Sequence, residues 1–335
     1  MGQKVFLTEQ QRTEGLSRAA EMLREAHRVL ILSHKSPDGD TMGSAFALCS
    51  ALRKLGKSAH VDCSDPLPKK YGYLYTGLVQ EHFEPDLVVA ADIATTDLFG
   101  EALETYAKRV DLCIDHHPSN TGYARVNLID PKAAATCEVM ADLIKLLDVD
   151  IDNNIADCLY TGIATDTGCF CYSNTTPRAL RTAADLIEHG ADSVRLNKLL
   201  FETKSRGRLR LEAMALASLE YHYNDLAALI VLTKEMTVQS GADEGETEGI
   251  PSIPARIEGV IAGITIKEKD AGVYKISLRT GAALNASDIC ARLGGGGHAA
   301  AAGCSLTGTL DAVKRAILSA VGEELDKKGM KGDAE

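Results

Sequence analysis

Side chains able to bind a metal ion occur together near the N-terminus, where an apolar run gives way to a predicted helix. His34, Asp38 and Asp40 fall in SHKSPDGDTMGS, after the apolar residues 29–33 and before a stretch with helical spacing. We therefore expect them on a strand-to-helix loop. In an open α/β sheet, such loops lie at the carboxyl ends of the strands and line the ligand crevice.

Further apolar runs end in the same kinds of side chain. DLVVAAD ends at Asp92, and VDLCIDHH ends at Asp115, His116 and His117. One more carboxylate, Asp166 in GIATDTG, follows an apolar helical stretch. Charges at such positions are costly to bury unless they are paired or bound to a cation. A shared cation would explain all of these positions together.

Each piece has a simpler explanation when taken alone. Asp38 and Asp40 could be turn or helix-capping residues, which is the commonest use of Asp before a helix. The histidine pair could be one packed and one exposed side chain, and Asp166 could be a residue at a helix end. The occurrence of all of them in order, each at an element boundary, favours a metal site.

The ligand types indicate which cations would suit such a site. Asp38, Asp40, Asp92 and Asp166 carry four negative charges, which two divalent cations would neutralise. Mixed imidazole and carboxylate ligands suit Mn²⁺, with Mg²⁺, Co²⁺ or Zn²⁺ as alternatives. Two metals about 3.5–4 Å apart can share a carboxylate and acidify a shared water, so that hydroxide attacks phosphorus at neutral pH.

The pattern of residues 1–175 predicts an α/β domain with an open, mainly parallel sheet. Short apolar runs alternate there with amphipathic stretches, as in strands and helices that follow one another. The predicted strands are 29–33, 59–63, 86–92 and 110–115, and the predicted helices are 43–55 and 133–147.

The remainder of the chain predicts a helical connector at 176–225 and a smaller α+β domain at 226–335. Helical spacing dominates the connector, whereas turn signals and short apolar runs dominate the domain that follows. The predicted parts of this domain are a loop at 239–254, strands at 260–267 and 273–279 joined by a turn at 270–272, and a disordered end at 326–335.

Composition narrows the class of protein. With 335 residues, 45% of them hydrophobic, the chain is long enough for two cores. The net charge of −11 argues against a sequence-independent grip on long duplex nucleic acid. Nine cysteines without a CxxC pair indicate reduced thiols in a cytoplasmic protein. No stretch reaches about 18 apolar residues, so no association with membranes is expected.

A second group of candidate residues lies near the C-terminus, in GGGGHAAAAG at 294–303. A glycine run lets backbone amides approach an anion, and a helix beginning at the alanines would favour phosphate. Gly296, Gly297 and His298 are therefore candidate phosphate contacts. Arg279, at the end of a predicted strand, could pair with a phosphate through two hydrogen bonds. The alternatives are a flexible loop with a packed alanine helix, and a surface ion pair for Arg279.

These motifs resemble those of a known superfamily. HKSPDGD, VVAAD, DHH and GIATDTG are similar to the motifs of the DHH phosphoesterases, which take their name from the triplet found here at 115–117. KISLRT at 275–280, followed by GGGGHAAAAG, resembles the substrate-binding DHHA1 domain that accompanies one subfamily. Thr280 stands where this motif often has Ser, and the hydroxyl is kept.

The resemblance implies a role for each candidate residue. His34 and Asp38 would hold one metal, Asp40, His116 and Asp166 the other, and Asp92 would bridge them. His117 would contact the substrate phosphate or protonate the leaving group, and Asp115 would orient a histidine. Arg279 and His298 would hold a terminal phosphate, so that a short substrate is clamped between the two domains.

For a chain with only these two domains, the resemblance is to the nanoRNase and pAp phosphatase type. It implies hydrolysis of very short RNA to mononucleotides and of 3′-phosphoadenosine 5′-phosphate (pAp) to AMP. Short RNA and nucleotides are then the expected partners, and a homodimer is left open.

Other functions stay open or are disfavoured. A phosphodiesterase for cyclic di-AMP or for the linear dinucleotides pApA and pGpG would use the same metals. A non-catalytic nucleotide sensor would be expected to lack a metal ligand, and none is missing. An inorganic pyrophosphatase would leave the GGGGH segment without a role. A processive exonuclease would be expected to carry further nucleic-acid-binding modules and a more basic surface.

Overall fold

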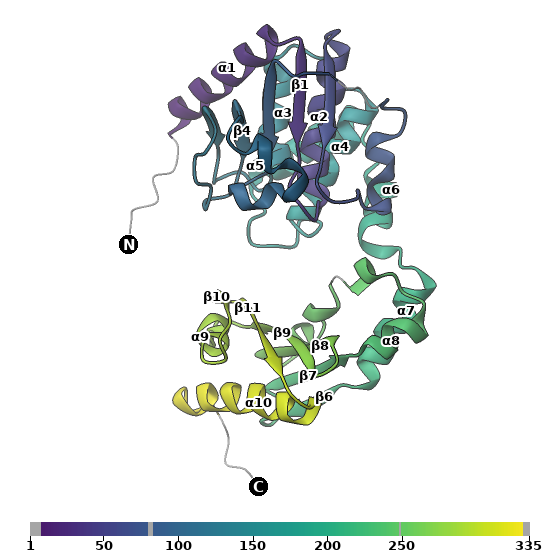
Figure 1. The fold of residues 1–335 in the computed structure, drawn as a ribbon, viewed down its shortest axis with the longest axis vertical. Helices are drawn as coiled ribbons and strands as arrows, with labels where there is room; N and C mark the ends of the chain where they lie inside the picture. Colours follow the sequence, from purple (N-terminus) through teal and green to yellow (C-terminus); the bar gives the residue numbers. More distant parts are fainter. Residues whose placement is uncertain (1–7, 80–82, 248, 331–335) are drawn as a thin grey trace. The chain divides into compact units, whose positions relative to one another are not determined.

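The computed structural model describes residues 8–79, 83–247 and 249–330. It divides the chain into two compact units, Met1–Thr203 and Lys204–Glu335 (Figure 1). Each unit has a hydrophobic core of its own. The division falls inside 176–225, the stretch for which we predict a helical connector.

The first unit is built on a five-stranded sheet of order β2-β1-β3-β4-β5, in which every neighbouring pair is parallel. The strands are β1 (Arg28–Leu32), β2 (Ser58–Asp62), β3 (Leu87–Ala91), β4 (Leu112–Asp115) and β5 (Val126–Ile129). The predicted α/β class and the four predicted strands are confirmed. Strand β5 was not predicted, because it has four residues and buries only Leu128 fully, which leaves little alternation to detect.

Helices cover one face of this sheet (Figure 1). They are α1 (Glu9–Glu25), α2 (Gly39–Lys54), α3 (Thr136–Leu146), α4 (Asn153–Asp166), α5 (Pro177–Glu188) and α6 (Ser193–Asn197), with the short turns η1 (Lys69–Tyr75) and η4 (Lys198–Glu202). The other face packs against two 3₁₀ turns, η2 (Thr96–Phe99) and η3 (Glu101–Tyr106), through Phe99 and Leu103. Both faces of the sheet are therefore apolar, as expected for parallel strands.

Two glycines allow α2 and α4 to pack closely. A Cβ atom on Gly43 of α2 would lie 2.4 Å from the carbonyl oxygen of Cys158 on α4, and one on Gly162 of α4 would lie 2.5 Å from Asp40 Oδ1 on α2. Contacts this short are not tolerated, so these positions require glycine. The close approach brings the start of α2 and the end of α4 to the same edge of the sheet.

The strand order places a switch point between β1 and β3. The chain goes from β1 to β2 on one side, and then continues through β3, β4 and β5 on the other. In doubly wound sheets the ligand crevice lies outside the carboxyl ends of the strands at such a point. The residues that follow β1, β3 and β4 are His34, Asp92 and His116, in the same order as the strands.

The second unit contains a mixed six-stranded sheet of order β10-β11-β9-β8-β7-β6, in which only β7 and β8 pair in parallel. Its elements are α7 (Arg206–Ala217), β6 (Glu220–His222), β7 (Ala227–Leu232), α8 (Lys234–Ser240), η5 (Glu244–Thr247), η6 (Ile250–Ser252), η7 (Pro254–Arg256), β8 (Ala262–Asp270), β9 (Val273–Thr280), α9 (Ala286–Ala291), β10 (Gly296–His298), β11 (Ala301–Thr307) and α10 (Leu310–Lys327). The predicted α+β class and the β8–β9 hairpin are confirmed.

The two faces of this second sheet are covered differently. Helices α9 and α10 pack on one face and form the main core with alternate residues of β7, β8, β9 and β11. On the other face, α7, α8 and η6 pack over β7 and enclose Ile230 and Leu232. The residues of β9, β10 and β11 that point to this second face are half-buried or exposed.

Two expectations for the second unit are wrong. The alanines after His298 do not begin a helix, because Ala301–Thr307 is strand β11, paired along its whole length with β9. Helix nucleation is unfavourable for so short a run, and burial of Ala302 and Cys304 against the core favours the strand.

Helix α10 continues to Lys327, so the first two residues of 326–335, predicted as disordered, are helical. Residues 331–335 lie outside the described residues.

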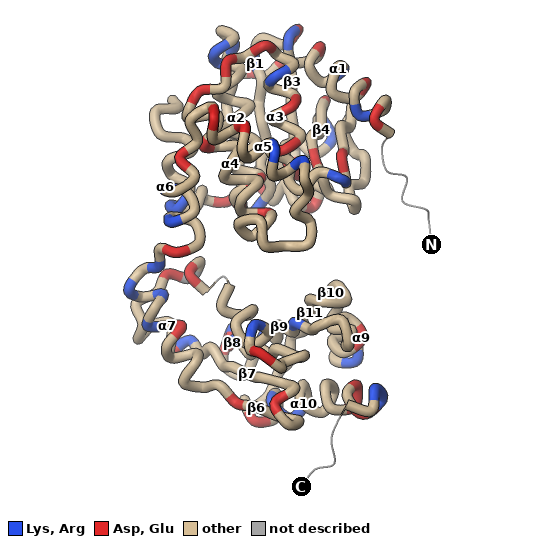
Figure 2. The backbone as a smooth tube through the Cα atoms, turned by 180° about the vertical axis from the view of Figure 1, so that it is seen from behind, with Lys and Arg blue, Asp and Glu red and all other residues tan. Residues whose placement is uncertain are grey.

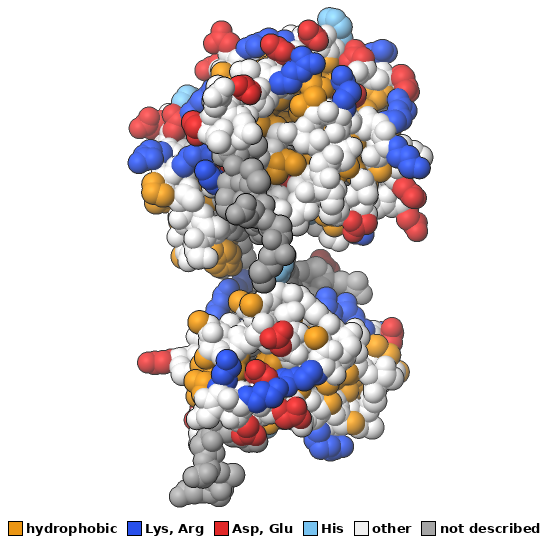
Figure 3. Space-filling view, turned by 90° about the vertical axis from the view of Figure 1, so that its left-hand side faces the viewer, with side chains coloured by type: hydrophobic (Ala, Val, Ile, Leu, Met, Phe, Trp, Pro, Cys, Tyr) orange, Lys and Arg blue, Asp and Glu red, His pale blue; other side chains and the backbone are white. Residues whose placement is uncertain are grey.

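Charges of both signs are interspersed over each unit. Lys and Arg alternate with Asp and Glu along the backbone in Figure 2, and both signs occur side by side on the face drawn in Figure 3. None of the helices within 8–79, 83–247 and 249–330 combines the length and the apolar character that a bilayer crossing requires.

Candidate metal centre

The loop after β1 presents one imidazole and one carboxylate. His34 donates from Nδ1 to the carbonyl oxygen of Lys35 at 2.8 Å, which leaves Nε2 without a proton in the neutral ring. Asp38 caps α2, since its Oδ1 accepts from the backbone N–H groups of Asp40 and Thr41. His34 Nε2 lies 3.7 Å from Asp38 Oδ1. Asp38 therefore caps α2, as considered from the sequence, and also belongs to the cluster of candidate ligands.

Asp40 is fully buried and holds the start of another helix. Its two carboxylate oxygens accept from the backbone N–H groups of Thr136 at 2.6 Å and Cys137 at 2.9 Å. These N–H groups open α3, whose N-cap, Ala135, offers no side-chain acceptor. A carboxylate is favourable at that helix end. A Cβ atom on Gly162 would lie only 2.5 Å from Asp40 Oδ1, so α4 can approach this carboxylate only through a glycine.

Asp92 lies at the centre of the group and is 2% exposed. Its Oδ2 is 3.7 Å from His34 Nε2, and its Oδ1 is 3.8 Å from His116 Nε2. Thr136 donates its hydroxyl to Oδ1 at 2.8 Å. The backbone of Asp92 has a φ of +62°, which is costly for a residue with a side chain and is often found at functional sites.

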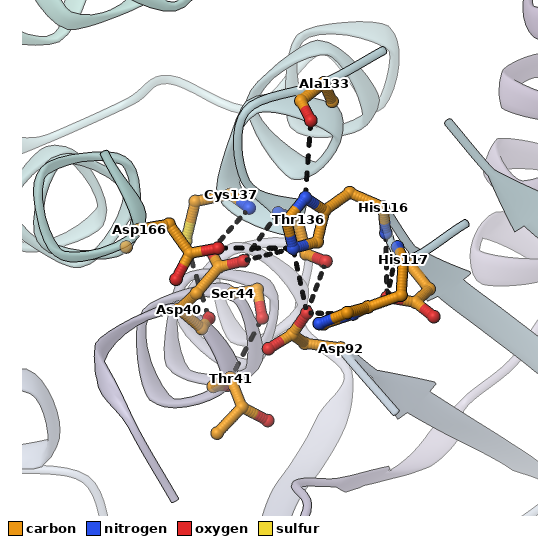
Figure 4. A network of polar contacts seen from close by, with 12 residues as sticks. Asp40, Thr41, Ser44, Asp92, His116, His117, Ala133, Thr136, Cys137 and Asp166 are labelled. Atoms are coloured by element: carbon orange, nitrogen blue, oxygen red, sulfur yellow. Dashed lines mark hydrogen bonds and ion pairs between the residues drawn. The ribbon is translucent and has the colours of Figure 1, made fainter. Parts of the chain in front are cut away.

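His116 faces three carboxylates (Figure 4). Its Nδ1 donates to the carbonyl oxygen of Ala133 at 3.3 Å. Its Nε2 lies 3.2 Å from Asp166 Oδ2, 3.8 Å from Asp92 Oδ1 and 3.9 Å from Asp40 Oδ2. This buried atom makes no hydrogen bond of acceptable geometry to any described residue.

His117 is held by its neighbours Asp115 and Asn120. Its Nδ1 donates to Asp115 Oδ1 at 2.8 Å, and Asn120 donates to Asp115 Oδ2 at 2.6 Å. Burial alone would raise the pKa of Asp115, but the hydrogen bond and charge of His117 outweigh it and hold this pKa below its usual value. The fixed Nδ1 proton leaves Nε2 of this partly exposed ring available to a substrate.

These side chains fall into overlapping groups whose ligand atoms lie within 4.8 Å of one another. The groups are His34, Asp38 and Asp92; Asp40, His116 and Asp166; and Asp92, His116 and His117. These groups contain seven of the eight residues that the sequence suggested for metal binding and catalysis, and the eighth, Asp115, is hydrogen-bonded to His117.

The chemistry of the groups fits divalent cations. Burial, together with nearby carboxylates, raises the pKa values of both Asp40 and Asp92 above their usual range. Cations beside these groups would remove that penalty. Both His34 and His116 donate the other ring N–H to a backbone carbonyl, as metal-bound histidines commonly do. Nε2 of His116, which faces three carboxylates without a hydrogen bond to any of them, also fits a ligand atom.

The candidate phosphate contacts of the second unit share one rung of its sheet. Arg279 on β9 pairs with Ala301 on β11, and Ala301 pairs with His298 on β10. Directly paired residues point to the same face, so Arg279 and His298 flank the small side chain of Ala301 on the face not covered by α9 and α10. The Arg279 guanidinium donates to the carbonyl oxygen of Leu278.

Gly296 and Gly297 were predicted to precede a helix and to contact phosphate, but their place in the structure is different. Gly296 and Gly297 lie on edge strand β10 and not before a helix. Gly297 has a φ of +148°, and a Cβ atom on it would lie 2.6 Å from the carbonyl oxygen of Ala301. A glycine is thus needed for the close approach of β10 to β11.

Three residues that build the centre were not found from the sequence. Thr136 binds Asp92, Asn120 binds Asp115, and Gly162 makes room for Asp40. The local signals are weak: Asn120 and Thr136 lie five and seven residues after a strand end, where polar residues are common in any α/β protein, and Gly162 is the first residue of GIATDTG, which drew attention only for its Asp166.

Comparison with known proteins decides the family. A sequence model described as the DHH family, N-terminal domain, matches residues 28–163, and one for the DHHA1 domain matches residues 224–327. The bifunctional oligoribonuclease and PAP phosphatase NrnA of Thermus thermophilus is 34% identical over 94% of this chain and 96% of its own length. The chain belongs to the DHH family. DHH phosphoesterases depend on metal ions, in agreement with the acidic and histidine groups described above.

Two further proteins are similar to this chain. An exopolyphosphatase-related protein from Bacteroides fragilis superimposes with a TM-score of 0.84 at 25% identity, over 95% of this chain and 98% of its own. The cyclic-di-AMP phosphodiesterase GdpP of Geobacillus thermodenitrificans is 25% identical over 86% of this chain but only 46% of its own length.

Proposed function

We propose that this DHH protein is a two-metal phosphoesterase that hydrolyses very short RNA to mononucleotides and pAp to AMP. The observation that carries the proposal is the place of Asp92, whose two oxygens face His34 on one side and His116 on the other. The Thermus thermophilus relative, which carries both activities in its name and matches nearly end to end, supports the substrate class.

In this proposal the two groups around Asp92 each hold one divalent cation, with Mn²⁺ preferred over Mg²⁺ or Co²⁺ because of the mixed ligands. His34 and Asp38 form one group, and Asp40, His116 and Asp166 form the other. Bound cations would supply positive charge to the phosphate oxygens and acidify a water. The protein keeps the ligands in place through the backbone contacts of Asp40, His34 and His116.

His117 is the proposed proton donor to the leaving oxygen. The carboxylate of Asp115 can only accept, so the proton on Nδ1 is fixed and exchange with substrate occurs at Nε2. The ring is 41% exposed, unlike that of His116 at 12%. This difference supports a role in contact with substrate for His117 and a role in metal binding for His116.

Arg279 and His298 are the proposed contacts to a substrate phosphate. A guanidinium can bind two oxygens of one phosphate, and Ala301 leaves room on the rung between the two side chains. These contacts would favour substrates that end in a phosphate. We propose short RNA and nucleotides, and not long duplexes, as the partners, and the cytoplasm as the location, where nine free cysteines would be stable.

Hydrolysis of cyclic di-AMP or of linear dinucleotides is the second candidate. The similarity to the cyclic-di-AMP phosphodiesterase of Geobacillus thermodenitrificans extends over 86% of this chain and favours it. The proposed metal site would serve either substrate. A sensor without activity is disfavoured, because the described residues include a complete set of candidate ligands.

A parallel assay tests the proposal. Purified full-length protein with Mn²⁺ would be incubated with a labelled RNA trinucleotide, pAp, pApA and cyclic di-AMP, with products separated by chromatography. Release of mononucleotides and AMP, lost on chelation, is expected. Faster turnover of cyclic di-AMP than of the trinucleotide and pAp would favour the second candidate, and inactivity on all four would overturn both.

A further inference from the structure

The loop that connects β5 to α3, residues 130–136, contacts three of the six candidate metal ligands. Thr136 donates to Asp40 through its backbone and to Asp92 through its hydroxyl. The carbonyl oxygen of Ala133 accepts from His116 (Figure 4). Side-chain positions at both candidate ion sites therefore depend on where this loop lies.

Asn174 extends these contacts to a fourth ligand. Its side-chain amide donates to the carbonyl oxygens of Ala134 at 3.2 Å and Asp166 at 3.1 Å. The loop is thus linked to the end of α4 as well as to α2, β3 and β4.

Two buried carboxylates hold the loop from within. Asp130 accepts from the backbone N–H of Lys132 at 3.2 Å, and Glu138 accepts from that of Ala134 at 3.0 Å. The side chain of Asp130 is 3% exposed, and that of Glu138 is fully buried. A buried carboxylate is costly to keep ionised unless a cation pairs with it.

Arg178, the second residue of α5, supplies that cation to both. Its Nη1 lies 2.7 Å from Asp130 Oδ2, and its Nε lies 2.7 Å from Glu138 Oε1. A third contact, from Nη2, reaches Asp142 on α3 at 3.1 Å. Arg12 also binds Asp130 and Asp142, but of these two arginines only Arg178 contacts Glu138. Arg178 therefore connects both carboxylates that hold the loop.

We propose that Arg178 is a positioning residue for the metal centre, acting through Asp130 and Glu138 on the loop 130–136. The ion pairs described for it involve none of the candidate metal ligands. Its guanidinium reaches both carboxylates at once, through a hydrogen bond to Asp130 and an ion pair with Glu138, and a lysine, with one point of charge, cannot do the same. This inference rests on the proposed metal site.

The test measures metal binding rather than turnover. Metal-free full-length protein is titrated with Mn²⁺ by calorimetry, well below the unfolding temperature, as wild type, Arg178→Lys and Glu138→Gln. Changes to groups that orient metal ligands commonly weaken affinity about 10- to 100-fold, and we expect this loss in both variants. The electron paramagnetic resonance spectrum of bound Mn²⁺ should broaden or shift in the same two variants.

Lys145→Met is the matched control. Lys145 pairs with Asp185 and so also joins α3 to α5, but at the far end of α3. This variant should bind Mn²⁺ like the wild type.

Three results would count against these ideas, and they can be told apart. Wild-type affinity in Arg178→Lys, with only a lower free energy of unfolding, would overturn the positioning role. If that variant does not fold, wild-type affinity in Glu138→Gln would do the same, because Gln keeps the acceptor for Ala134 but weakens the contact with Arg178. Failure of the wild type to bind Mn²⁺ would instead overturn the metal site itself.

Discussion

The imidazole Nδ1 of His117 lies 2.8 Å from Asp115 Oδ1, next to a metal-ligand candidate, His116, whose own Nδ1 is bound to a backbone carbonyl. Neighbouring histidines are thus oriented by different partners. Either kind of partner fixes the tautomer and the orientation of the ring, but only the partner of His117 is a carboxylate. This difference separates the proposed proton donor from the proposed ligand.

Replacement of His117 by Gln should lower kcat with little effect on Mn²⁺ affinity. A positioned acid typically contributes about 10²–10⁴-fold to rate, and we expect a loss in that range on pAp. His189→Gln, at the end of α5, is the control and should retain full activity. Unchanged kcat in His117→Gln would remove His117 from the mechanism.

Arg279→Lys should raise KM for pAp by about 10-fold or more, since a charge-assisted hydrogen bond contributes about 1.5–3 kcal/mol. Steady-state kinetics with pAp measures this, and kcat should change less than KM. Arg315→Ala on α10, exposed and on the helix that covers the opposite face of the sheet, should behave like the wild type. Equal KM values for all three proteins would contradict a phosphate contact at Arg279.

Stability should fall in acid because of Asp130. Burial would raise the pKa of Asp130, but the hydrogen bonds from Arg178 and Arg12 outweigh it and hold this pKa below its usual value. A carboxyl with a lower pKa in the folded state stabilises the fold above its unfolded pKa, and this contribution is lost as pH falls through the folded pKa. Glu138 and Asp142 face the same guanidinium groups.

The measurement for Asp130 is the free energy of urea unfolding from pH 7 to pH 3. Asp130→Asn should lose about 1–3 kcal/mol at pH 7 and show a shallower decline below about pH 4 than the wild type. Parallel curves for the two proteins would show that Asp130 does not carry this acid dependence.

Gly162→Ala should destabilise the first unit and disturb Asp40. The added methyl would meet Cys137 Sγ at 2.2 Å and Asp40 Oδ1 at 2.5 Å, and such overpacking costs about 1–3 kcal/mol. Thermal unfolding and Mn²⁺ titration should both respond. Gly72→Ala, whose methyl would meet only Tyr75 Oη at 3.8 Å, is the control. If Gly162→Ala and Gly72→Ala unfolded at the same temperature and bound Mn²⁺ equally well, the packing of α2 against α4 would not require a glycine at position 162.

The convergence of the strand-end residues could be predicted from the sequence. His34, Asp92 and His116 each follow an apolar run, and parallel strands present their carboxyl ends at one edge of a sheet. The family resemblance added Arg279 and His298 as candidate phosphate contacts. The register of β9, β10 and β11 places both residues on one rung of the second sheet.

What holds these residues in place could not be predicted. The carbonyl of Ala133 and the N–H groups of Thr136 and Cys137 belong to the backbone, and no residue type marks a backbone group as a partner of Asp40 or His116. Arg178 lies 48 residues after Asp130 and 40 after Glu138, so only the fold brings it to these carboxylates. The alanine run after His298 shows the opposite error, since its helix propensity was overridden by pairing with β9.

Asp92 offers the most direct test of the account, because both proposed ion sites depend on it. The measurement is Mn²⁺-dependent release of mononucleotides from a labelled RNA trinucleotide by the wild type and by Asp92→Asn. We expect the wild type to be active with Mn²⁺ and inactive after chelation, and Asp92→Asn to lose at least about 100-fold in rate. Full activity in Asp92→Asn, or activity of the wild type that survives chelation, would contradict a two-metal centre organised around this carboxylate.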